Sequence, residues 1–436
     1  MRSTKQIDIR HQGMVAERET LMTTVTSTDA SQALAAYLSS QYPAFWSSDA
    51  SKARIEGLKA EKADALLRVL KYDDAGEPTY LLRDSNLGDF YAFDLATNKL
   101  FSDILASRAP IDTLVAYRDS EIFQRDPQKE GEEQEELQRL GYRISAHRFT
   151  PEQLKTIENE ISGATFINRG IFSREMTGGQ IMAAIRDGSI TKSAGLNGDT
   201  FWLKDQNGAA HSNFFHKLAF DPYILSMVSQ YLGCAPVHVQ TNLWFSFPTL
   251  KDKNNLSTNA QMFHQDKEFT KFIKVFIYLS DVGPDNGPHA YVVGSHIDEA
   301  HTHGIGFSDR IPDEDITKYY AADRIKSLVG PAGTITFGDT SCVHKGVPVE
   351  AGYRLMLQLE YASSLYLSPV EPFTAMEPQR LAAMPFAEPV KQRMVANYND
   401  QHRAAYRQAT AAAVAPEPSA FRKVLRLAKR YVKNRL

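Results

Sequence analysis

The first part of the chain carries its apolar residues at helical spacing, whereas the middle alternates apolar and polar residues as strands do. Between residues 28 and 70 the apolar positions lie on one helical face, as in Leu34, Tyr37, Leu38 and Tyr42, then Ala63, Leu66, Leu67 and Leu70. Because residues at this spacing share one side of a helix, residues 28–70 are predicted to be mostly helical.

Beyond Thr79 the pattern changes to that of short strands. Residues 80–82 and 90–93 are clusters of aromatic and branched residues around turn-forming sequences, which predicts strands there. Residues 31–125 are therefore predicted to form a small α+β unit, to which the sequence assigns no function. Residues 1–30, which are polar and rich in Thr and Ser, are predicted to be disordered.

The middle of the chain is predicted to be mainly β. Branched and aromatic residues fill short runs at 141–145, 237–247, 271–279, 290–293, 333–337 and 354–361. Turns rich in Asn, Gly and Pro separate most of these runs. Many short strands with few helices between them are typical of an antiparallel sandwich or jelly roll.

Two helix starts are clearly marked in this region. Thr150 is followed by Pro151 and Gln153, the arrangement of an N-cap, a first-turn proline and the partner residue of a capping box. Asp221 precedes a second proline and predicts a helix that ends before Gly233.

Changes in composition indicate the domain boundaries. Residues 126–137 are mostly acidic, and the sequence leaves open whether they form a linker or the beginning of an exposed helix. Residues 138–375 then form the main domain. From 376 to 436 the pattern is helical again, with an Ala-rich stretch near 404–415 and a basic end.

Composition excludes several classes of protein. The chain has 436 residues, which favours more than one domain. Its formal net charge of -3 gives no reason to expect nucleic acid as a partner. Cys234 and Cys342 are the two cysteines, so we expect no disulfide framework and a reducing, cytoplasmic compartment. Neither a signal peptide at residues 1–13 nor an apolar run of about 18 residues is expected.

One pattern of metal-ligand residues stands out. His264 and Asp266 lie two positions apart, so on a strand their side chains point to the same side, about 6.6 Å apart. The pattern alone is weak, because His296 and Asp298 repeat it. Its position before the run at 271–279 favours the first copy, and His344, beyond the run at 333–337, offers a further nitrogen ligand.

Arg354 completes a constellation with chemical meaning. If the turn after His344 is centred near Val349, His344 and Arg354 face each other on paired strands. Two imidazoles and one carboxylate suit Fe(II) and leave three coordination positions open. A 2-oxo acid can take two of these and dioxygen the third. The distal carboxylate of the 2-oxo acid then needs a buried, permanently charged partner, which an arginine provides.

Residues 138–366 resemble the phytanoyl-CoA dioxygenase family of 2-oxoglutarate oxygenases. The blocks that carry the resemblance are Phe263-His264-Gln265-Asp266, Tyr278-Leu279-Ser280-Asp281, Asn286-Gly287-Pro288, Val293-Gly294-Ser295-His296, and Val343-His344-Lys345-Gly346 with Arg354. Their order is specific, although each block alone is not. One departure is Val293, where the family usually has proline.

The resemblance implies a double-stranded β-helix (jelly roll) core, so that with the surrounding helices and the small N-terminal unit the expected fold class is α+β. The N-terminal unit and the basic end of the chain lie outside the resemblance. It implies an iron site at His264, Asp266 and His344, and Arg354 as the anchor of the co-substrate. The expected activity is hydroxylation of an unactivated C–H bond with Fe(II), 2-oxoglutarate and O2, releasing succinate and CO2. Halogenases of this fold carry a small residue in place of the carboxylate, so Asp266 favours hydroxylation.

Two other functions stay open. The jelly roll could be a non-redox sugar-binding or isomerase module that kept the fold, or the protein could be a membrane-surface scaffold with a vestigial oxygenase. The complete triad and the arginine argue against the first of these, because a binding module needs no open iron positions. The substrate could be a small metabolite, a lipid thioester, a sugar nucleotide or a glycan.

Further residues are candidates for the pocket. Gln240, Asn242 and Trp244 share one strand face, which either lines the substrate pocket or faces water. Lys274, among aromatic residues, either binds an anionic group of the co-substrate or is exposed. The histidines from His296 to His303 form a second possible metal cluster or a solvated loop. Cys342 is interpreted as a packing residue.

The basic end of the chain predicts a membrane or partner contact. Residues 421–436 contain Arg422, Lys423, Arg426, Lys429, Arg430, Lys433 and Arg435 and no acidic residue. Apolar residues from Phe421 to Val432 follow helical spacing, so a helix here has one apolar stripe. Such a helix either lies on the inner face of an anionic membrane or docks on the protein itself, and the sequence leaves both open.

Overall fold

The computed structural model describes residues 27–76, 94–108, 119–168, 174–190, 200–248, 256–257, 260–297, 310–368 and 370–414. The predicted strands at 80–82 and 90–93, residues 298–309 with His301 and His303, and the basic segment 421–436 lie outside the described residues. No described helix is both long enough and apolar enough to cross a bilayer.

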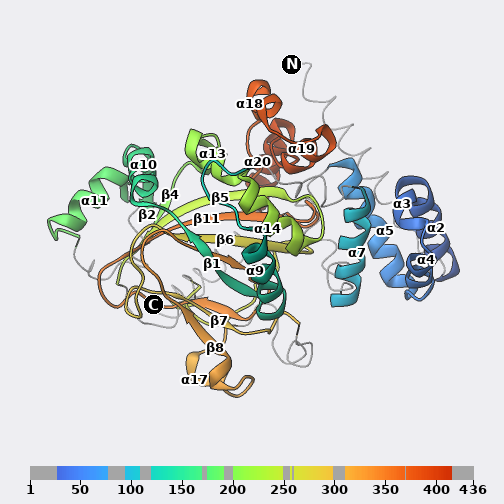
Figure 1. Cartoon of the computed structure of the whole chain (residues 1–436), viewed down its shortest axis with the longest axis horizontal. Coiled ribbons are helices and arrows are strands. Elements are labelled where there is room, and N and C mark those ends of the chain that lie inside the picture. Colours follow the sequence, from blue (N-terminus) through green and yellow to red (C-terminus); the bar gives the residue numbers. More distant parts are fainter. Residues whose placement is uncertain are drawn as a thin grey trace, which may run out of the picture.

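The N-terminal part of the described chain is helical, as the apolar spacing predicts. Its helices are α2 (Ser27–Gln41), α3 (Pro43–Trp46), α4 (Asp49–Glu56), α5 (Ala60–Ala75) and α7 (Leu95–Arg108), which lie together beside the sheet in Figure 1. Leu34, Leu38, Leu66 and Leu70 are completely buried where α2 packs on α5. Burial of this stripe away from water is the main force that holds such short helices together.

The largest sheet has eight antiparallel strands in the order β1-β9-β6-β11-β5-β4-β2-β3. The strands are β1 (Tyr142–Arg148), β2 (Thr165–Asn168), β3 (Arg174–Thr177), β4 (Thr200–Leu203), β5 (Val237–Ser246), β6 (Phe272–Tyr278), β9 (Thr334–Gly338) and β11 (Arg354–Ala362). The predicted strands at 141–145, 237–247, 271–279, 333–337 and 354–361 are thereby confirmed.

A second sheet has three antiparallel strands, in the order β10-β7-β8. They are β7 (His289–Val292), β8 (Ile325–Leu328) and β10 (His344–Gly346), and β7 confirms the strand predicted at 290–293. His344 pairs with Tyr291 in this sheet, whereas Arg354 pairs with Ser246 in the large sheet. The predicted pairing of His344 with Arg354 is therefore wrong, because the chain crosses from one sheet to the other between them.

The two faces of the large sheet have different roles. On β6, Ile273, Val275 and Ile277 belong to the main apolar core, together with residues of the helix α14 (Pro222–Leu232) that covers this outer face (Figure 1). The alternate residues of the strand, which include Lys274 and Phe276, point to the inner face. Asp221 caps α14 through its side chain and Gly233 ends it, and the capping box at Thr150 begins α10 (Pro151–Ser162), as predicted.

The acidic segment at 126–137 is not a linker. It forms most of α9 (Pro127–Leu140), capped by the side chain of Asp126. The helix was predicted as exposed, but one of its faces is buried against α14. Glu133 accepts a hydrogen bond of 2.8 Å from the Tyr223 hydroxyl, and Gln134 donates one of 2.6 Å to the carbonyl of Met227. Acidic residues can occupy a buried face because each has a donor there.

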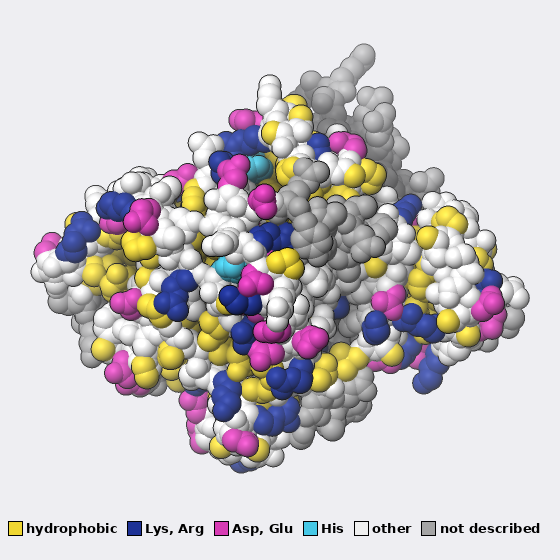
Figure 2. All heavy atoms as spheres, viewed as in Figure 1, with side chains coloured by type: hydrophobic (Ala, Val, Ile, Leu, Met, Phe, Trp, Pro, Cys, Tyr) yellow, Lys and Arg dark blue, Asp and Glu magenta, His cyan; other side chains and the backbone are white. Residues whose placement is uncertain are grey.

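The remaining helices surround the sheets. They are α11 (Gly178–Arg186), α12 (Gln206–Ala210), α13 (Asn213–Ala219), α17 (Asp313–Ile316), the short 3-10 helix η2 (Ala322–Arg324), α18 (Pro378–Ala383), α19 (Glu388–Met394) and α20 (Asp400–Val414). The Arg393 guanidinium pairs with Asp73 at 3.0 Å and so joins α19 to α5. Acidic and basic side chains are interspersed over the face shown in Figure 2.

Candidate metal centre

The two predicted histidine ligands face each other directly. The amide of His264 donates to the carbonyl of His344 at 2.9 Å, and the amide of His344 donates to the carbonyl of His264 at 2.9 Å. This reciprocal pair is an antiparallel bridge between the segment before β6 and the strand β10. The imidazole centroids are consequently only 4.4 Å apart.

Hydrogen bonds orient both imidazoles. Nδ1 of His264 lies 2.8 Å from the carbonyl oxygen of Met262, and Nδ1 of His344 lies 2.9 Å from that of Cys342. A carbonyl can only accept, so Nδ1 carries the proton in each ring and Nε2 keeps its lone pair for a metal. Burial, followed by the neighbouring His264, lowers the pKa of His344 to about 3, which keeps its imidazole neutral.

Asp266 completes the set. Its Oδ1 lies 3.5 Å from Nε2 of His264, and its Oδ2 lies 3.6 Å from Nε2 of His344. One ligand atom from each of the three residues lies within 4.8 Å of the others. Two imidazole nitrogens and one carboxylate oxygen, converging from one side, fit a divalent iron ion that keeps open positions.

Lys274 lies beside Asp266 and is buried, so the interpretation of this lysine as exposed is wrong. Its Nζ is 2.9 Å from Oδ2 of Asp266 and 2.7 Å from Oε2 of Glu268. Burial opposes the charge of Lys274, but Asp266 and then Glu268 hold its pKa well above the usual value. Burial likewise opposes the charge of Asp266, whereas Lys274 and then His344 hold its pKa well below the usual value.

Glu360 is the neighbour of Lys274 on the adjacent strand, and it is completely buried. Burial, and then the carboxylate of Glu268, raise the pKa of Glu360 well above its usual value. The inner face thus carries a short row of Glu360, Lys274 and Asp266 that the sequence analysis did not assemble. A lone acidic residue in the apolar run at 354–361 was the available signal.

Arg354 is buried on the inner face of the large sheet, at the start of β11. Its Nη1 donates to the carbonyl of Gly287, and its Nη2 lies 3.4 Å from the Ser246 hydroxyl. Nε is buried without a hydrogen-bond partner, and among the described residues no carboxylate pairs with the guanidinium. Burial lowers the pKa of Arg354 to about 10, which still leaves it charged. A buried cation in this state needs an anion, and the described part of the chain places no carboxylate against it.

The sequence of the main domain matches a known family model. The model described as phytanoyl-CoA dioxygenase (PhyH) covers residues 137–352, the segment that contains the three converging ligands. Residues 137–352 belong to the phytanoyl-CoA dioxygenase family. Enzymes of this family use Fe(II), 2-oxoglutarate and O2, and the protein is a 2-oxoglutarate-dependent dioxygenase of this type. No curated protein matches the chain by sequence.

Solved structures of low identity resemble about half of the chain. One is the epimerase SnoN in complex with Fe3+, alpha-ketoglutarate and nogalamycin RO (16% identity, 54% of this chain and 84% of that chain, TM-score 0.36). Another is HygX from Streptomyces hygroscopicus with nickel and 2-oxoglutarate (13%, 53% and 86%, TM-score 0.35). A third is AviO1 from Streptomyces viridochromogenes (14%, 53% and 94%, TM-score 0.34). These scores are low, and the family assignment rests on the sequence match.

Two inner residues of this dioxygenase were missed by the sequence analysis. His289 opens β7 and stacks its ring edge against Phe276 at 4.2 Å, and no described residue makes a hydrogen bond to its imidazole. Burial and then Arg354 hold the pKa of His289 well below its usual value, so it is neutral. Tyr291 stacks on His344 at 5.5 Å, and its hydroxyl occupies the space that a side chain at Gly338 would need. His289 and Tyr291 are alternate residues of β7, and this alternation is the sequence pattern that could have identified them.

The predicted pocket residues Gln240, Asn242 and Trp244 lie on the inner face of β5. Their partners on the neighbouring strand β11 are Glu360, Gln358 and Met356, respectively. Nε2 of Gln358 donates to Oε1 of Gln240 at 2.6 Å. The polar face predicted for β5 therefore belongs to the dioxygenase interior and not to the outer surface.

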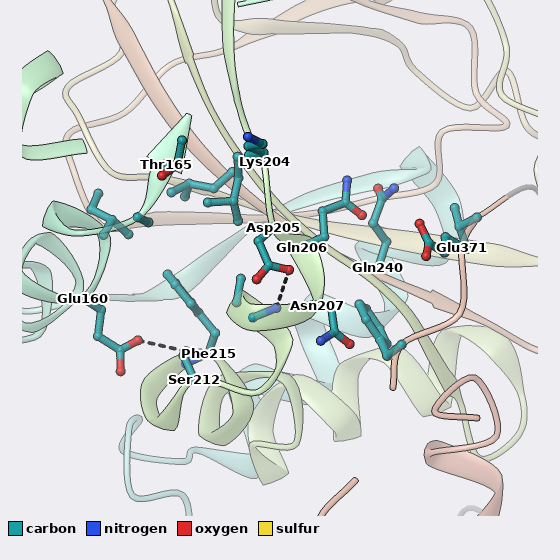
Figure 3. Close-up of a pocket in the computed structure, with 18 of the residues that line it drawn as sticks. Glu160, Thr165, Lys204, Asp205, Gln206, Asn207, Ser212, Phe215, Gln240 and Glu371 are labelled. Carbon is teal, nitrogen blue, oxygen red and sulfur yellow. Dashed lines mark hydrogen bonds between the residues drawn. The ribbon is translucent and has the colours of Figure 1, made fainter. Parts of the chain in front are cut away.

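A large groove lies away from the three candidate metal ligands. It has a volume of about 1050 Å³ and lies at the edge of β5, between α10, α12, α13 and the C-terminal segment (Figure 3). Gln240 lines it, together with Glu160, Asp205 and Glu371. Of the three predicted pocket residues, Gln240 lines this groove, whereas Asn242 and Trp244 do not. Gln240 therefore lies both at the groove and beside Gln358 of the inner face.

The second histidine pattern of the dioxygenase has a different environment. Nε2 of His296 lies 3.0 Å from the carbonyl oxygen of Gln138, and its Nδ1 lies 3.3 Å from Sγ of Cys342. Both nitrogens are thus in contact with protein atoms. Cys342 is completely buried beside Tyr291 and Leu328, which confirms it as a packing residue.

Proposed function

We propose that the protein hydroxylates an unactivated C–H bond of a small molecule, with Fe(II) held by His264, Asp266 and His344. The observation that carries the proposal is the convergence of the two Nε2 atoms on Asp266, with each Nδ1 fixed by a carbonyl. When bound, such an iron centre supplies oxidation by O2, coupled to the conversion of 2-oxoglutarate to succinate and CO2. The protein supplies binding, orientation and exclusion of water.

We further propose that Arg354 anchors the distal carboxylate of 2-oxoglutarate. Support comes from its burial and from the lack of any described carboxylate partner. Lys274, the other predicted cation for the co-substrate, already contacts two carboxylates, Asp266 and Glu268. Arg354 is therefore the better candidate. The charge of Arg354 also helps, after burial, to lower the pKa of His289, which lies in the same interior.

The core is proposed to be a double-stranded β-helix. Support comes from two antiparallel sheets of eight and three strands, bridged at His264 and His344. A polar inner row with Gln240, Asn242 and Gln358 favours a substrate with hydrogen-bonding groups over a bare alkyl chain, since unpaired buried amides would be costly. We propose Gln240, Asn242 and Trp244 as residues of the substrate pocket.

The alternative of a non-redox sugar-binding or isomerase module has less support. Such a module has no use for a buried arginine that lacks an anion. It also has no use for two imidazoles held in the tautomer that binds a metal. The proposed oxygenase uses both features.

The test is succinate formation. Protein freed of metal with a chelator is given Fe(II), 2-oxoglutarate and O2, and succinate is measured without any other substrate. We expect succinate above the level of an Fe(II)-free sample, and no such excess for His264→Ala. His296→Ala is the matched control, because its imidazole lies outside the proposed iron site, and it should behave as wild type. Equal succinate from wild type and His264→Ala would contradict the proposal.

A further inference from the structure

Lys274 occupies an unusual place for a lysine. It lies in the middle of β6, in register with Glu360 on one side and Gly338 on the other, and only 8% of its side chain is exposed. Gly338 has no side chain, and neither carboxylate oxygen of Glu360 makes a hydrogen bond among the described residues, so the neighbouring strands do not hold the Lys274 ammonium by a hydrogen bond at its own level. The ammonium reaches instead to Asp266 and Glu268, which precede the strand.

The contacts of Asp266 are unequal. Oδ2 receives the Lys274 ammonium at 2.9 Å, in addition to lying 3.6 Å from Nε2 of His344. Oδ1 lies 3.5 Å from Nε2 of His264, and no cation contacts it among the described residues. An ammonium holds the carboxylate oxygen it contacts by a charge-assisted hydrogen bond, which is stronger than a neutral one.

A cation next to a metal site does not serve to attract the metal. Two like charges repel, and an aspartate without the lysine would hold a divalent ion more strongly. Lys274 is also fixed in place, since Glu268 binds its Nζ at 2.7 Å from the other side. These contacts therefore indicate that Lys274 orients the carboxylate of Asp266.

We infer that Lys274 is a positioning residue: it retains Oδ2 of Asp266, so that the carboxylate offers the metal Oδ1 alone. This inference rests on the proposed iron site. Two imidazoles and one oxygen leave three of six positions open. A carboxylate bound through both oxygens would leave only two, and 2-oxoglutarate would fill both. Lys274 thus keeps free the position at which a diatomic gas binds beside the co-substrate.

The proposed role of Lys274 affects binding of a diatomic gas but not binding of Fe(II) and 2-oxoglutarate. A general loss of structure would weaken both kinds of binding together. Lys274→Met should still bind Fe(II) and 2-oxoglutarate, but should bind nitric oxide, a probe of the remaining position, at least about tenfold more weakly than wild type. Neighbours of metal ligands commonly have effects of this size. Nitric oxide is titrated under anaerobic conditions into protein loaded with Fe(II) and 2-oxoglutarate, and the paramagnetic resonance signal of the adduct is followed.

Three further samples complete the design. Lys326→Met, an exposed lysine of β8, is the matched control and should behave as wild type. Lys274→Gln, which is shorter and uncharged but polar, replaces Lys274→Met if the latter does not fold, and the same loss is expected. Oxalate, a chelator without a distal carboxylate, replaces 2-oxoglutarate in a parallel titration with each variant.

The outcomes are distinct. Unchanged nitric oxide affinity in both Lys274 variants would overturn the inference. Loss of 2-oxoglutarate binding with oxalate binding intact would also overturn it, since Lys274 would then contact the co-substrate. If wild type binds neither Fe(II) nor 2-oxoglutarate, both the inference and the proposed function fail. If wild type binds both and the variants match it, only the role of Lys274 fails.

Discussion

His264 and His344 exchange both of their backbone hydrogen bonds, although they lie far apart in the sequence. Residues paired in this way have their side chains close together, and here the two imidazoles are 4.4 Å apart. Backbone pairing therefore sets the spacing of the two nitrogen ligands before any metal binds. Asp266, two residues after His264, is brought to the same place by the continuation of this segment, where its amide donates to the carbonyl of Thr340 at 2.8 Å.

Removal of either histidine should abolish the metal site. His264→Ala and His344→Ala each remove one of three ligands, so we expect Fe(II) or Mn(II) affinity to fall by more than the roughly 10- to 100-fold typical of outer contacts. Calorimetric titration of metal into the chelator-treated protein measures this. His296→Ala should retain about one bound ion, and loss of metal in that variant would instead favour the second histidine cluster.

Replacement of Arg354 should weaken the binding of 2-oxoglutarate without weakening the binding of the metal. Arg354→Met leaves the distal carboxylate without its cation, and one-sided loss of a buried charge pair costs about 3–5 kcal/mol. We expect the affinity of Mn(II)-loaded protein for 2-oxoglutarate to fall at least about 100-fold, with metal binding unchanged. Arg407→Met, a largely exposed arginine of the groove in Figure 3, is the control. An unchanged affinity would assign the carboxylate to another cation.

The oxidation should insert oxygen and not chlorine. Asp266 occupies the position at which related halogenases carry a small residue, so chloride has no vacant place on the metal. Once a substrate has been found by screening for stimulated succinate formation, its product should gain the mass of one oxygen atom in buffer that contains chloride. A chlorinated product from the wild-type protein would refute the assignment.

Asp221 should make stability depend on pH. Burial raises its pKa to about 6, although hydrogen bonds from Ser120 and the amide of Tyr223 oppose this. The folded state thus binds a proton more readily than the unfolded state, so stability falls as pH rises through the window between the two pKa values. Asp221→Asn keeps an oxygen to cap α14 but does not ionise.

The variant should therefore gain stability relative to wild type as pH rises. Between about pH 4.5 and about pH 7.5 we expect a relative gain of roughly 1–2 kcal/mol. Denaturant unfolding at the two pH values measures the difference. Asp187→Asn, which removes an exposed carboxylate with a lowered pKa, is the control and should leave the change in stability between these two pH values close to that of wild type, because both values lie above the usual pKa of an aspartate. A constant difference between Asp221→Asn and wild type would contradict the prediction.

The basic segment 421–436 lies outside the described residues, and its membrane interpretation stays a prediction. Each Lys or Arg near an anionic surface contributes about 1 kcal/mol. The full chain should therefore sediment with anionic vesicles at low salt, less at moderate salt, and not with neutral vesicles. A chain ending at Ser419 should lose this association. Equal sedimentation of the two chains would favour docking of the segment on the protein itself.

Local patterns were enough to predict most of the elements that surround the site. The capping box at Thr150 and the proline after Asp221 act over a few residues, and both helices begin where the sequence places them. The strand segments were predicted for the same reason, because alternation along β6 and β11 reflects an inner and an outer face. The acidic helix α9 was misjudged, since its buried face depends on donors such as Tyr223 that lie far along the chain.

Only some features of the candidate site could be predicted from the sequence. His264, Asp266, His344 and Arg354 were singled out by residue type, order and family resemblance, and the first three converge. The predicted strand pairing of His344 with Arg354 was wrong, because a short turn does not specify in which sheet the next strand pairs. Lys274 was singled out, but its burial was not predicted, because a lysine in a strand is usually exposed unless a distant acid faces it.

The sequence by itself determined most of the helices and strands around the site, the family of residues 137–352 and the types of candidate ligand, since these depend on neighbours along the chain and on ordered motifs. Only the tertiary structure decided which atoms meet. The pairing of His264 with His344, the contact of Lys274 with Asp266 and the lack of a carboxylate beside Arg354 among the described residues follow from two sheets that bring distant segments together. Such contacts depend on register and on the crossing between sheets, which no local pattern of residues specifies.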